Sequence, residues 1–197
     1  MNKTLMILCT LTAAFALAAP DADAAGRVKA RGAMQNAEGG ITASRASAAR
    51  GPNGGSAARG RGVKTDGQGN GQAASGGAVR GPNGGTGARA GSTSWNADGS
   101  AQHQSSGQNS SGTTQGGFVR NADGAVSGGR TTSATGTQGG SYNADTAYGN
   151  GTAQRSVDAT GRNGNSYQST IDATKGEGVT RTATCYDPNG AVIPCVK

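Results

Sequence analysis

Arginine and lysine are concentrated in one half of this chain, where they could bind anionic groups. Ten of them occur between residues 25 and 90 against two carboxylates, a net charge of +8, whereas residues 91–197 hold seven of each sign and are neutral. The forked guanidinium group of arginine suits phosphate and carboxylate groups. We therefore expect the basic stretch to bind anionic polymers; charge that only keeps a glycine-rich chain in solution is the alternative. The expected contact residues are Arg27, Lys29, Arg31, Arg45, Arg50, Arg59, Arg61, Lys64, Arg80 and Arg89.

Catalytic chemistry has little support in the sequence. His103 is the only histidine, and no cysteine or carboxylate accompanies it in a local motif. The carboxylates occur mostly in turn-like tetrads, where their ordinary role is to accept backbone hydrogen bonds. We expect no catalytic residues, no metal, no cofactor and no small-molecule substrate.

Two cysteines, Cys185 and Cys195, flank the last turn-like tetrad, DPNG. With this turn between them, Cys185 falls opposite Ile193, and Pro194 can bring Cys195 inward as a diagonal neighbour. We expect a disulfide that closes a C-terminal hairpin. A metal or redox role is the alternative, but two cysteines without a nearby histidine supply too few zinc ligands.

The segment 1–24 is typical of a bacterial signal peptide. Lys3 supplies a positive charge, residues 5–19 are apolar, and Ala22-Asp23-Ala24 has small residues at both positions that signal peptidase recognises. This pattern predicts export to the periplasm, the cell surface or the extracellular space. It also predicts no transmembrane segment once the signal is removed.

Composition after residue 24 argues against a conventional core. Only thirteen residues are Val, Ile or Phe, none is Leu, and all 37 glycines remain. Ordering each residue costs about 1 to 2 kcal/mol of backbone entropy, and glycine costs the most. Either the chain is disordered, or backbone hydrogen bonds in a regular sheet supply what burial cannot.

A repeated tetrad distinguishes between these alternatives. RGPNGG occurs at residues 50–55 and 80–85, and related tetrads recur about every 14 residues. The residues suit a type I turn followed by a glycine in the left-handed conformation of a bulge, a common way to close an antiparallel hairpin. Clear copies are NAEG at 36, GPNG at 51 and 81, NADG at 96 and 121, DATG at 158 and DPNG at 187; weaker copies are KTDG at 64, NSSG at 109, SATG at 133, NADT at 143 and DATK at 172. The clear copies give the turn glycines as Gly39, Gly54, Gly84, Gly99, Gly124, Gly161 and Gly190.

The predicted fold is all-β, a glycine-rich antiparallel meander of repeated hairpins, with a solenoid-like or self-assembling arrangement left open. A largely disordered low-complexity chain is the alternative. Large residues tend to precede the tetrads, which favours order because a linker has no reason to place its few large side chains at one phase of a repeat. The domain prediction is a signal peptide (1–24), a basic Gly/Arg-rich half (25–90), a neutral Gly/Ser/Thr-rich half (91–180) and a disulfide-closed hairpin (181–197).

Two resemblances concern the turns and the composition. CYDPNGAV at 185–192 resembles one unit of the Tyr-Asp hairpin repeats of bacterial Rhs-type shell proteins, and SYNAD at 141–145 is a looser match. The Gln, Asn, Ser and Gly content is similar to that of curli-type functional amyloid. Both imply hairpins that pair into large sheets, and neither assigns a role to a particular residue.

Two functional hypotheses lead. The first is an exported, non-catalytic structural, surface or matrix protein that self-associates through its hairpins. The second is a binding module that holds lipopolysaccharide, extracellular DNA or acidic polysaccharide with its basic half. An ice-binding surface array, suggested by Thr-x-Thr at 135–137 and 182–184, ranks below them.

Overall fold

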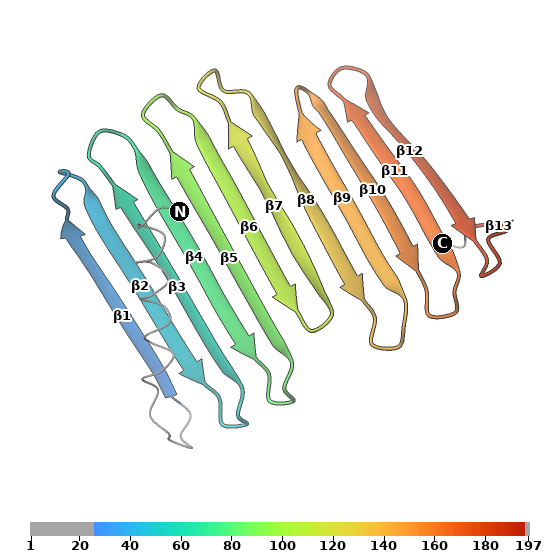
Figure 1. Cartoon of the computed structure of the whole chain (residues 1–197), viewed down its shortest axis with the longest axis horizontal. Helices are drawn as coiled ribbons and strands as arrows, with labels where there is room; N and C mark the ends of the chain where they lie inside the picture. Colours follow the sequence, from blue (N-terminus) through green and yellow to red (C-terminus); the bar gives the residue numbers. More distant parts are fainter. Residues whose placement is uncertain (1–25, 196–197) are drawn as a thin grey trace. The chain divides into compact units, whose positions relative to one another are not determined.

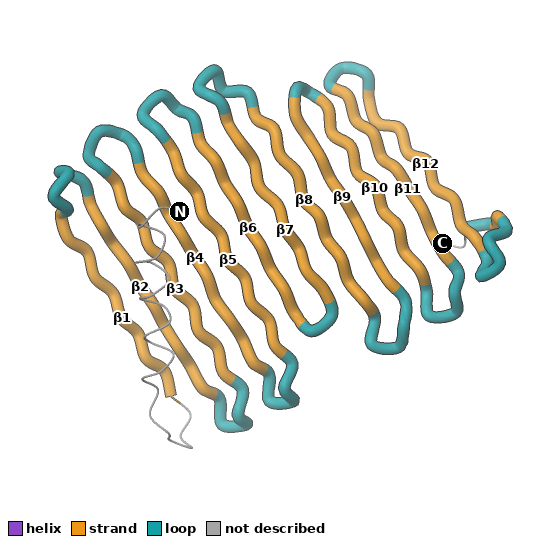
Figure 2. The backbone as a smooth tube through the Cα atoms, in the orientation of Figure 1, coloured by secondary structure: helices purple, strands orange, loops and turns teal. Residues whose placement is uncertain are grey.

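The structure is a computed structural model that describes residues 26–195. Its thirteen strands form an antiparallel meander in which strand order follows chain order, and the described residues contain no helix (Figure 1). Consequently none of them forms a helix long and apolar enough to cross a membrane. The predicted all-β hairpin meander is confirmed, and short loops join its strands (Figure 2). The predicted signal peptide lies outside the described residues.

The described residues divide into two compact units, 26–97 and 98–195. The first unit is regular, because five strands of ten residues alternate with five-residue loops that start at residues 36, 51, 66 and 81. The loops therefore recur at a constant interval. The strands are β1 (Gly26–Gln35), β2 (Ile41–Arg50), β3 (Ser56–Thr65), β4 (Gly71–Arg80) and β5 (Thr86–Trp95).

The second unit mixes five-residue loops with tighter turns. At Asn150 and Gly151 both φ angles are positive, 53° and 79°, as a two-residue type I′ hairpin turn requires. The strands are β6 (Ala101–Asn109), β7 (Gly112–Arg120), β8 (Val126–Thr135), β9 (Ser141–Gly149), β10 (Thr152–Thr160), β11 (Ser166–Thr174), β12 (Gly178–Tyr186) and β13 (Val192–Ile193).

Six of the seven predicted turn glycines have the predicted left-handed conformation. Gly39, Gly54, Gly84, Gly99, Gly124 and Gly190 have φ angles between 80° and 88°. In each of the loops that start at residues 51 and 81, the glycine N–H donates to the carbonyl oxygen three residues earlier, at 3.2 and 3.1 Å. A type I turn with a left-handed glycine accounts for this pattern.

Gly161 is a correction. It lies in a turn, but at the first position, and the left-handed residue is Gly164 with φ 84°. The preceding residues of DATG belong to β10, and NADT and DATK likewise lie within or at the end of β9 and β11. The loop comprises residues 161–165 and turns at Asn163-Gly164, so Asp158, Ala159 and Thr160 of the predicted tetrad continue strand β10.

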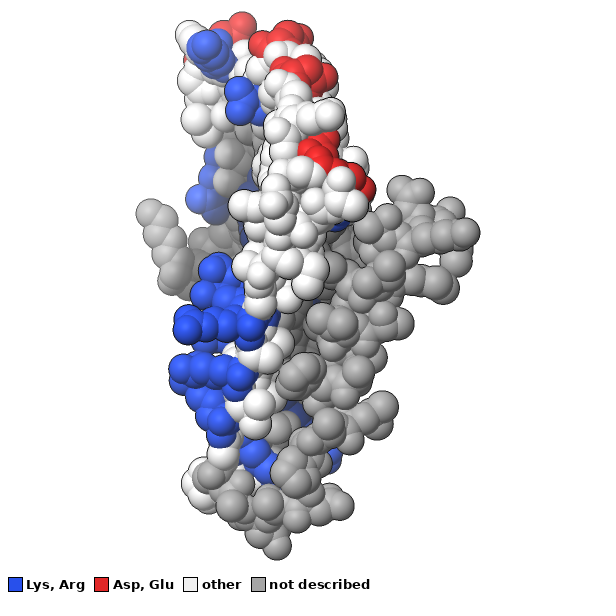
Figure 3. Space-filling model, turned by 90° about the vertical axis from the view of Figure 1, so that its left-hand side faces the viewer, with Lys and Arg blue, Asp and Glu red and all other residues white. Residues whose placement is uncertain are grey.

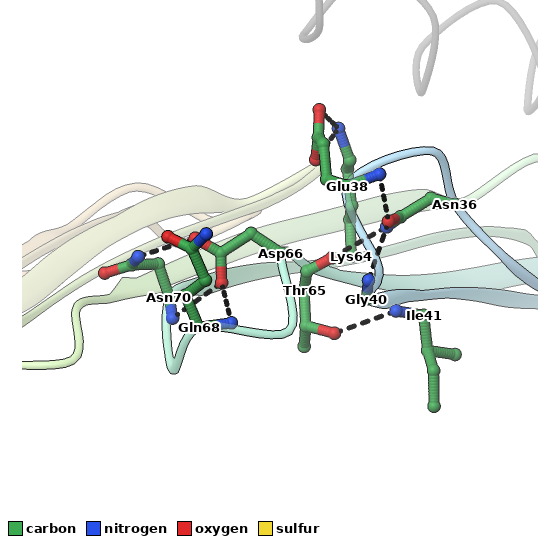
Figure 4. Close-up of polar contacts among 9 residues, drawn as sticks. All are labelled: Asn36, Glu38, Gly40, Ile41, Lys64, Thr65, Asp66, Gln68 and Asn70. Carbon is green, nitrogen blue, oxygen red and sulfur yellow. Dashed lines mark hydrogen bonds and ion pairs between the residues drawn. The ribbon is translucent and has the colours of Figure 1, made fainter.

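Neighbouring loops at one end of the first unit are joined by side chains (Figure 4). Asn36 Nδ2 donates to the carbonyl oxygen of Thr65 at 2.7 Å, and the Thr65 hydroxyl accepts from the N–H of Ile41 at 3.0 Å. Gly40 is buried here, and a Cβ at this position would collide with the backbone of Thr65. These contacts hold the loops that start at 36 and 66 together and so help to fix the register of the strands between them.

The loop that starts at Asp66 depends on its carboxylate. Asp66 Oδ1 accepts from the backbone N–H groups of Gln68 and Asn70 at 2.8 and 3.1 Å, and Oδ2 accepts from Asn70 Nδ2 at 2.6 Å. The hydrogen bond from the Asn70 side chain, followed by that from Gln68, lowers the pKa of Asp66 below its ordinary value.

The sheet has almost no interior. Among the described residues Ala144, 4% exposed, is the one buried apolar residue, and Ser169, 7% exposed, is the one buried polar residue. Val28, Met34 and Val179 are more than half exposed. Ladder hydrogen bonds between strands, rather than buried apolar area, therefore hold each unit together.

The C-terminal hairpin is closed as predicted. Cys185 and Cys195 form a disulfide with a Cα–Cα separation of 5.3 Å, and Cys185 pairs with Ile193 in the ladder between β12 and β13. Pro194 separates the paired Ile193 from Cys195. The disulfide thus fastens the two-residue strand β13 to the end of β12.

Two glycines of the first unit test the turn assignment. A Cβ at Gly54 or at Gly32 would meet no atom within 4 Å, but Gly54 has φ 80° while Gly32 lies within strand β1. We expect Gly54→Val to lower the free energy of unfolding by about 1 to 2 kcal/mol, because a β-branched residue resists positive φ. Gly32→Val should be neutral or stabilising, because valine favours a strand. Urea titrations followed by far-UV circular dichroism measure both; equal effects would contradict the turn assignment.

Candidate polyanion-binding face

The ladder register sorts the side chains of the first unit onto two faces. Successive residues of a strand point to opposite sides, and residues directly opposite each other on antiparallel strands point to the same side. The register therefore places seven cations on one face, which we call the basic face. All seven are exposed. They are Arg27, Lys29, Arg31, Arg45, Arg59, Arg61 and Arg89.

Three of the ten cations expected from the sequence lie elsewhere. Arg50, Lys64 and Arg80 occupy the opposite face, at or next to the ends of β2, β3 and β4. Lys64 is also engaged there, since its Nζ lies 2.9 Å from a carboxylate oxygen of Glu38. The structure thus brings together seven of the expected residues and separates the other three from them.

Arginines stand directly opposite one another on the basic face. Arg31 pairs with Arg45, and Arg45 pairs with Arg61, so three guanidinium-bearing residues form one row across β1, β2 and β3. Neighbouring strands are about 4.8 Å apart. Like charges directly opposite each other destabilise a sheet, so this row lowers the stability of the free protein.

The described residues provide little to neutralise this charge. The carboxylates of residues 26–97 are those of Glu38 and Asp66, and both lie in loops. Within the basic face, Arg59 Nε donates to the neutral hydroxyl of Ser47 at 3.2 Å. Seen toward the β1 edge, Lys and Arg side chains gather along one side of the described strands (Figure 3). The basic face is therefore a positively charged and solvated surface.

The opposite face of the first unit is built from small side chains away from its ends, and we call it the small-residue face. Apart from Val28 on the edge strand β1, its interior positions hold alanine, glycine and serine. They are Ala30, Gly32, Ser44, Ala46, Ala48, Ala58, Gly60, Gly62, Ala74, Gly76, Ala78, Ala88, Ala90 and Ser92. The two faces thus differ sharply in charge and in side-chain size.

The second unit has an aromatic face and a polar face. The register puts Phe118, Tyr142, Tyr148, Tyr167 and four arginines on the aromatic face, while glutamines, threonines and the carboxylates of Asp145, Asp158 and Asp172 lie on the polar face. The four arginines are Arg120, Arg130, Arg155 and Arg181.

Two of these arginines hold tyrosines. Arg155 Nη2 donates to the Tyr142 hydroxyl at 3.0 Å, and Arg181 Nη2 donates to the Tyr167 hydroxyl at 2.9 Å. Hydrogen bonds with Ser169 and then with Arg181 lower the pKa of the Tyr167 phenol below its ordinary value. Sequence reasoning missed these pairs because their members lie on different strands and 13 or 14 residues apart.

His103 makes a packing contact with an aromatic side chain. Its ring is stacked on that of Phe118 with centroids 5.4 Å apart. In the part of the chain that the structure describes, no three His, Cys, Asp or Glu residues lie close enough to hold a metal ion. An open depression of about 440 Å³ over β7 to β10 has Thr131, Asp145 and Gln154 in its lining. Within this depression the Thr131 hydroxyl donates to Asp145 Oδ1 at 2.7 Å, and the Gln154 amide donates to Asp172 Oδ1 at 2.8 Å, so these polar side chains hydrogen-bond across the strands.

The grouping on the basic face had a signal in the sequence. Because the loops of the first unit recur at a constant interval, each ladder pair joins two odd-numbered or two even-numbered positions. The seven cations of the basic face are odd-numbered, and Arg50, Lys64 and Arg80 are even-numbered. No protein-family model matches this chain, and neither a curated protein nor a solved structure matches it, so geometry and charge alone carry its functional assignment.

Proposed function

We propose that this chain is an exported, non-catalytic protein that binds anionic polymers through the basic face of its first unit. The observation that carries the proposal is the exposed row of Arg31, Arg45 and Arg61, which has no carboxylate among its ladder partners. Such a row costs stability in the free protein and becomes favourable only when an anion lies over it.

Charge-assisted contacts allow an open sheet face to bind an anionic polymer. Each guanidinium offers donors in a fixed fork that matches a carboxylate or phosphate group. A polymer makes several such contacts at once and releases its counterions, so an open surface binds it without a deep pocket. The proposed ligands are the polyanions found outside bacterial cells: lipopolysaccharide, acidic polysaccharide and extracellular DNA.

Export is part of the proposal and has its own support. The signal-like segment 1–24 indicates secretion. The disulfide between Cys185 and Cys195 fits an oxidising compartment.

Paired substitutions on the two faces test the binding proposal. We expect Arg45→Gln/Arg61→Gln to weaken heparin binding about tenfold or more at low salt, because each lost charge-assisted contact is worth about 1.5 to 3 kcal/mol. Arg50→Gln/Arg80→Gln removes the same charge from the opposite face and serves as the matched control.

Affinity measured over a salt series distinguishes a local site from general attraction. The basic-face variant should show a shallower dependence of affinity on salt, with the slope reduced by about the number of contacts removed. If both pairs of substitutions weaken binding equally, the basic face is not the site. If wild-type protein does not bind heparin even at low salt, the proposal is wrong.

A structural or matrix role is the second candidate, because the small-residue face of the first unit has no charged side chain away from its ends. The alanine, glycine and serine side chains of the small-residue face allow close approach of another sheet, as in stacked sheets. Sedimentation of the mature protein across a concentration series tests this role. Particles that grow with concentration support it, and a monomer at all concentrations contradicts it.

A further inference from the structure

In one row of the basic face, beside the row of Arg31, Arg45 and Arg61, cations recur at every second strand. Lys29 on β1 faces Ser47 on β2, and Ser47 faces Arg59 on β3. The same row continues through Gly77 on β4 to Arg89 on β5. Lys29, Arg59 and Arg89 therefore lie on a line perpendicular to the strands, with one neutral residue between each pair and a spacing of about 9.5 Å.

The second unit contains the same arrangement. Arg130 on β8 faces Thr146 on β9, and Thr146 faces Arg155 on β10. The row continues through Ile171 on β11 to Arg181 on β12. Three exposed arginines again lie at every second strand of one row.

The number of residues between successive cations differs between the two units, so it does not explain why both place a cation at every second strand. The cations of the first unit, at positions 29, 59 and 89, are farther apart along the chain than those of the second unit, at positions 130, 155 and 181. The shorter separations arise from the tighter turns and shorter strands around β10 and β12. What the two units share is the distance between cations in space.

The tyrosines of the second unit follow the same two-strand spacing. Tyr142 and Tyr167 lie in one row, separated by Ala159, and each accepts a hydrogen bond from an arginine of the cation row. Both rings are half-buried, so part of each ring surface stays accessible. A guanidinium held beside an aromatic ring offers an anionic contact and an apolar contact side by side.

We infer that each unit binds a linear acidic polysaccharide that lies across the strands and carries one carboxylate in each disaccharide. The inference rests on the proposed function and narrows its ligand. Two linked pyranose rings in an extended chain are about as long as two strand spacings, about 9.5 Å. In both units the guanidinium fork matches a planar carboxylate, and in the second unit tyrosine rings add apolar surface for the sugar rings.

A nucleic acid fits this spacing poorly. Each strand of duplex DNA carries a phosphate about every 3.4 Å along the helix axis. A row with one cation about every 9.5 Å leaves most of those phosphates without a contact. DNA is therefore the competing ligand in the test.

The test moves one cation by one strand and keeps the total charge. In Ser47→Arg/Arg59→Ser the pair that faces across β2 and β3 is simply reversed, so composition, face and net charge stay the same. The even spacing of the row is lost, because the moved arginine now stands directly opposite Lys29. Circular dichroism checks that the sheet remains.

Binding of the mature full-length chain is measured with three probes: hyaluronan decasaccharide, heparin decasaccharide and an oligothymidylate of five charges. The second unit keeps its own row of arginines, so we expect the swap to weaken hyaluronan binding about tenfold at one of two sites and to leave heparin binding within about twofold. We also expect wild-type protein to bind hyaluronan more tightly than the oligothymidylate, which has the same number of charges.

The outcomes separate the inference from the proposed function. A swap that binds hyaluronan at two equal sites, as expected of wild type, or tighter binding of the oligothymidylate by wild type, overturns the inference and leaves polyanion binding in place. Failure of wild type to bind all three probes at low salt overturns both. A swap that loses its sheet signal leaves the comparison of hyaluronan with oligothymidylate on wild-type protein to decide.

Discussion

Replacing Arg45 with glutamate should make the protein more stable and, at the same time, a poorer binder of polyanions. Arg45 stands between Arg31 and Arg61, so the substitution turns two repulsive cross-strand pairs into two attractive ones. Each cross-strand pair contributes roughly 0.2 to 1 kcal/mol. The free energy of unfolding should therefore rise by about 0.5 to 2 kcal/mol.

Heparin affinity should fall about a hundredfold in the same variant, because a carboxylate placed beside an anionic ligand costs several kcal/mol. Urea titration and heparin affinity at low salt measure the two effects on one sample. Their opposite directions are informative, since a substitution that merely damages the sheet lowers both stability and affinity.

Arg50→Glu is the control for this experiment. Arg50 pairs with Gly26 and Ser56 at the edge of the small-residue face, so it faces no cation across the ladder. Its replacement should change stability little and weaken heparin binding much less than Arg45→Glu. A loss of stability in Arg45→Glu would show that the arginine row does not strain the sheet.

Removing the disulfide should release the C-terminal hairpin. Cys185 and Cys195 are 10 residues apart, and closing a loop of this size stabilises a fold by about 2 to 3 kcal/mol in the chain-entropy model. Strand β13 has two residues and pairs with β12 at Cys185 and Tyr186 alone, so its ladder is too short to replace the covalent link. We expect Cys185→Ala/Cys195→Ala to lose protection of β13 from amide hydrogen exchange.

The exchange experiment has an internal control. Reduced wild-type protein should match the double variant, and reductant should leave the double variant unchanged. Strands β6 to β10 should keep their protection, because several ladders separate them from the hairpin. Unchanged exchange in residues 185–195 after reduction would mean that the ladder and the turn hold the hairpin without the disulfide.

Local chemistry explains which turns the sequence predicted well. At Gly54 and Gly84 the preceding Pro-Asn pair fixes a type I turn, and glycine takes the left-handed position without strain. The same reasoning placed a turn at DATG, where the chain continues as strand β10. Asn163-Gly164 lies just beyond it, and a choice between two adequate turns depends on the pairing of the strands on either side.

The candidate site was predicted as a list of cations but not as a surface. Arg45 and Arg50 look alike in the sequence, yet they point to opposite faces because they are an odd number of positions apart along one strand. The Arg–Tyr pairs of the second unit had no local signal at all. Their members meet because tight turns at 150–151 and 175–177 set the register of β9 to β12.

The all-β class, six of the seven turn glycines, the disulfide and the imbalance of charge could be predicted, because each depends on residue type and on neighbours within a few positions. The strand register, fixed only in the folded sheet, decides which cations stand opposite one another and how far apart they lie. The reason is that side chains alternate with a period of two along a strand, so a shift of one residue in register exchanges the faces. In this chain that register divides ten similar cations into seven that form one surface and three that do not.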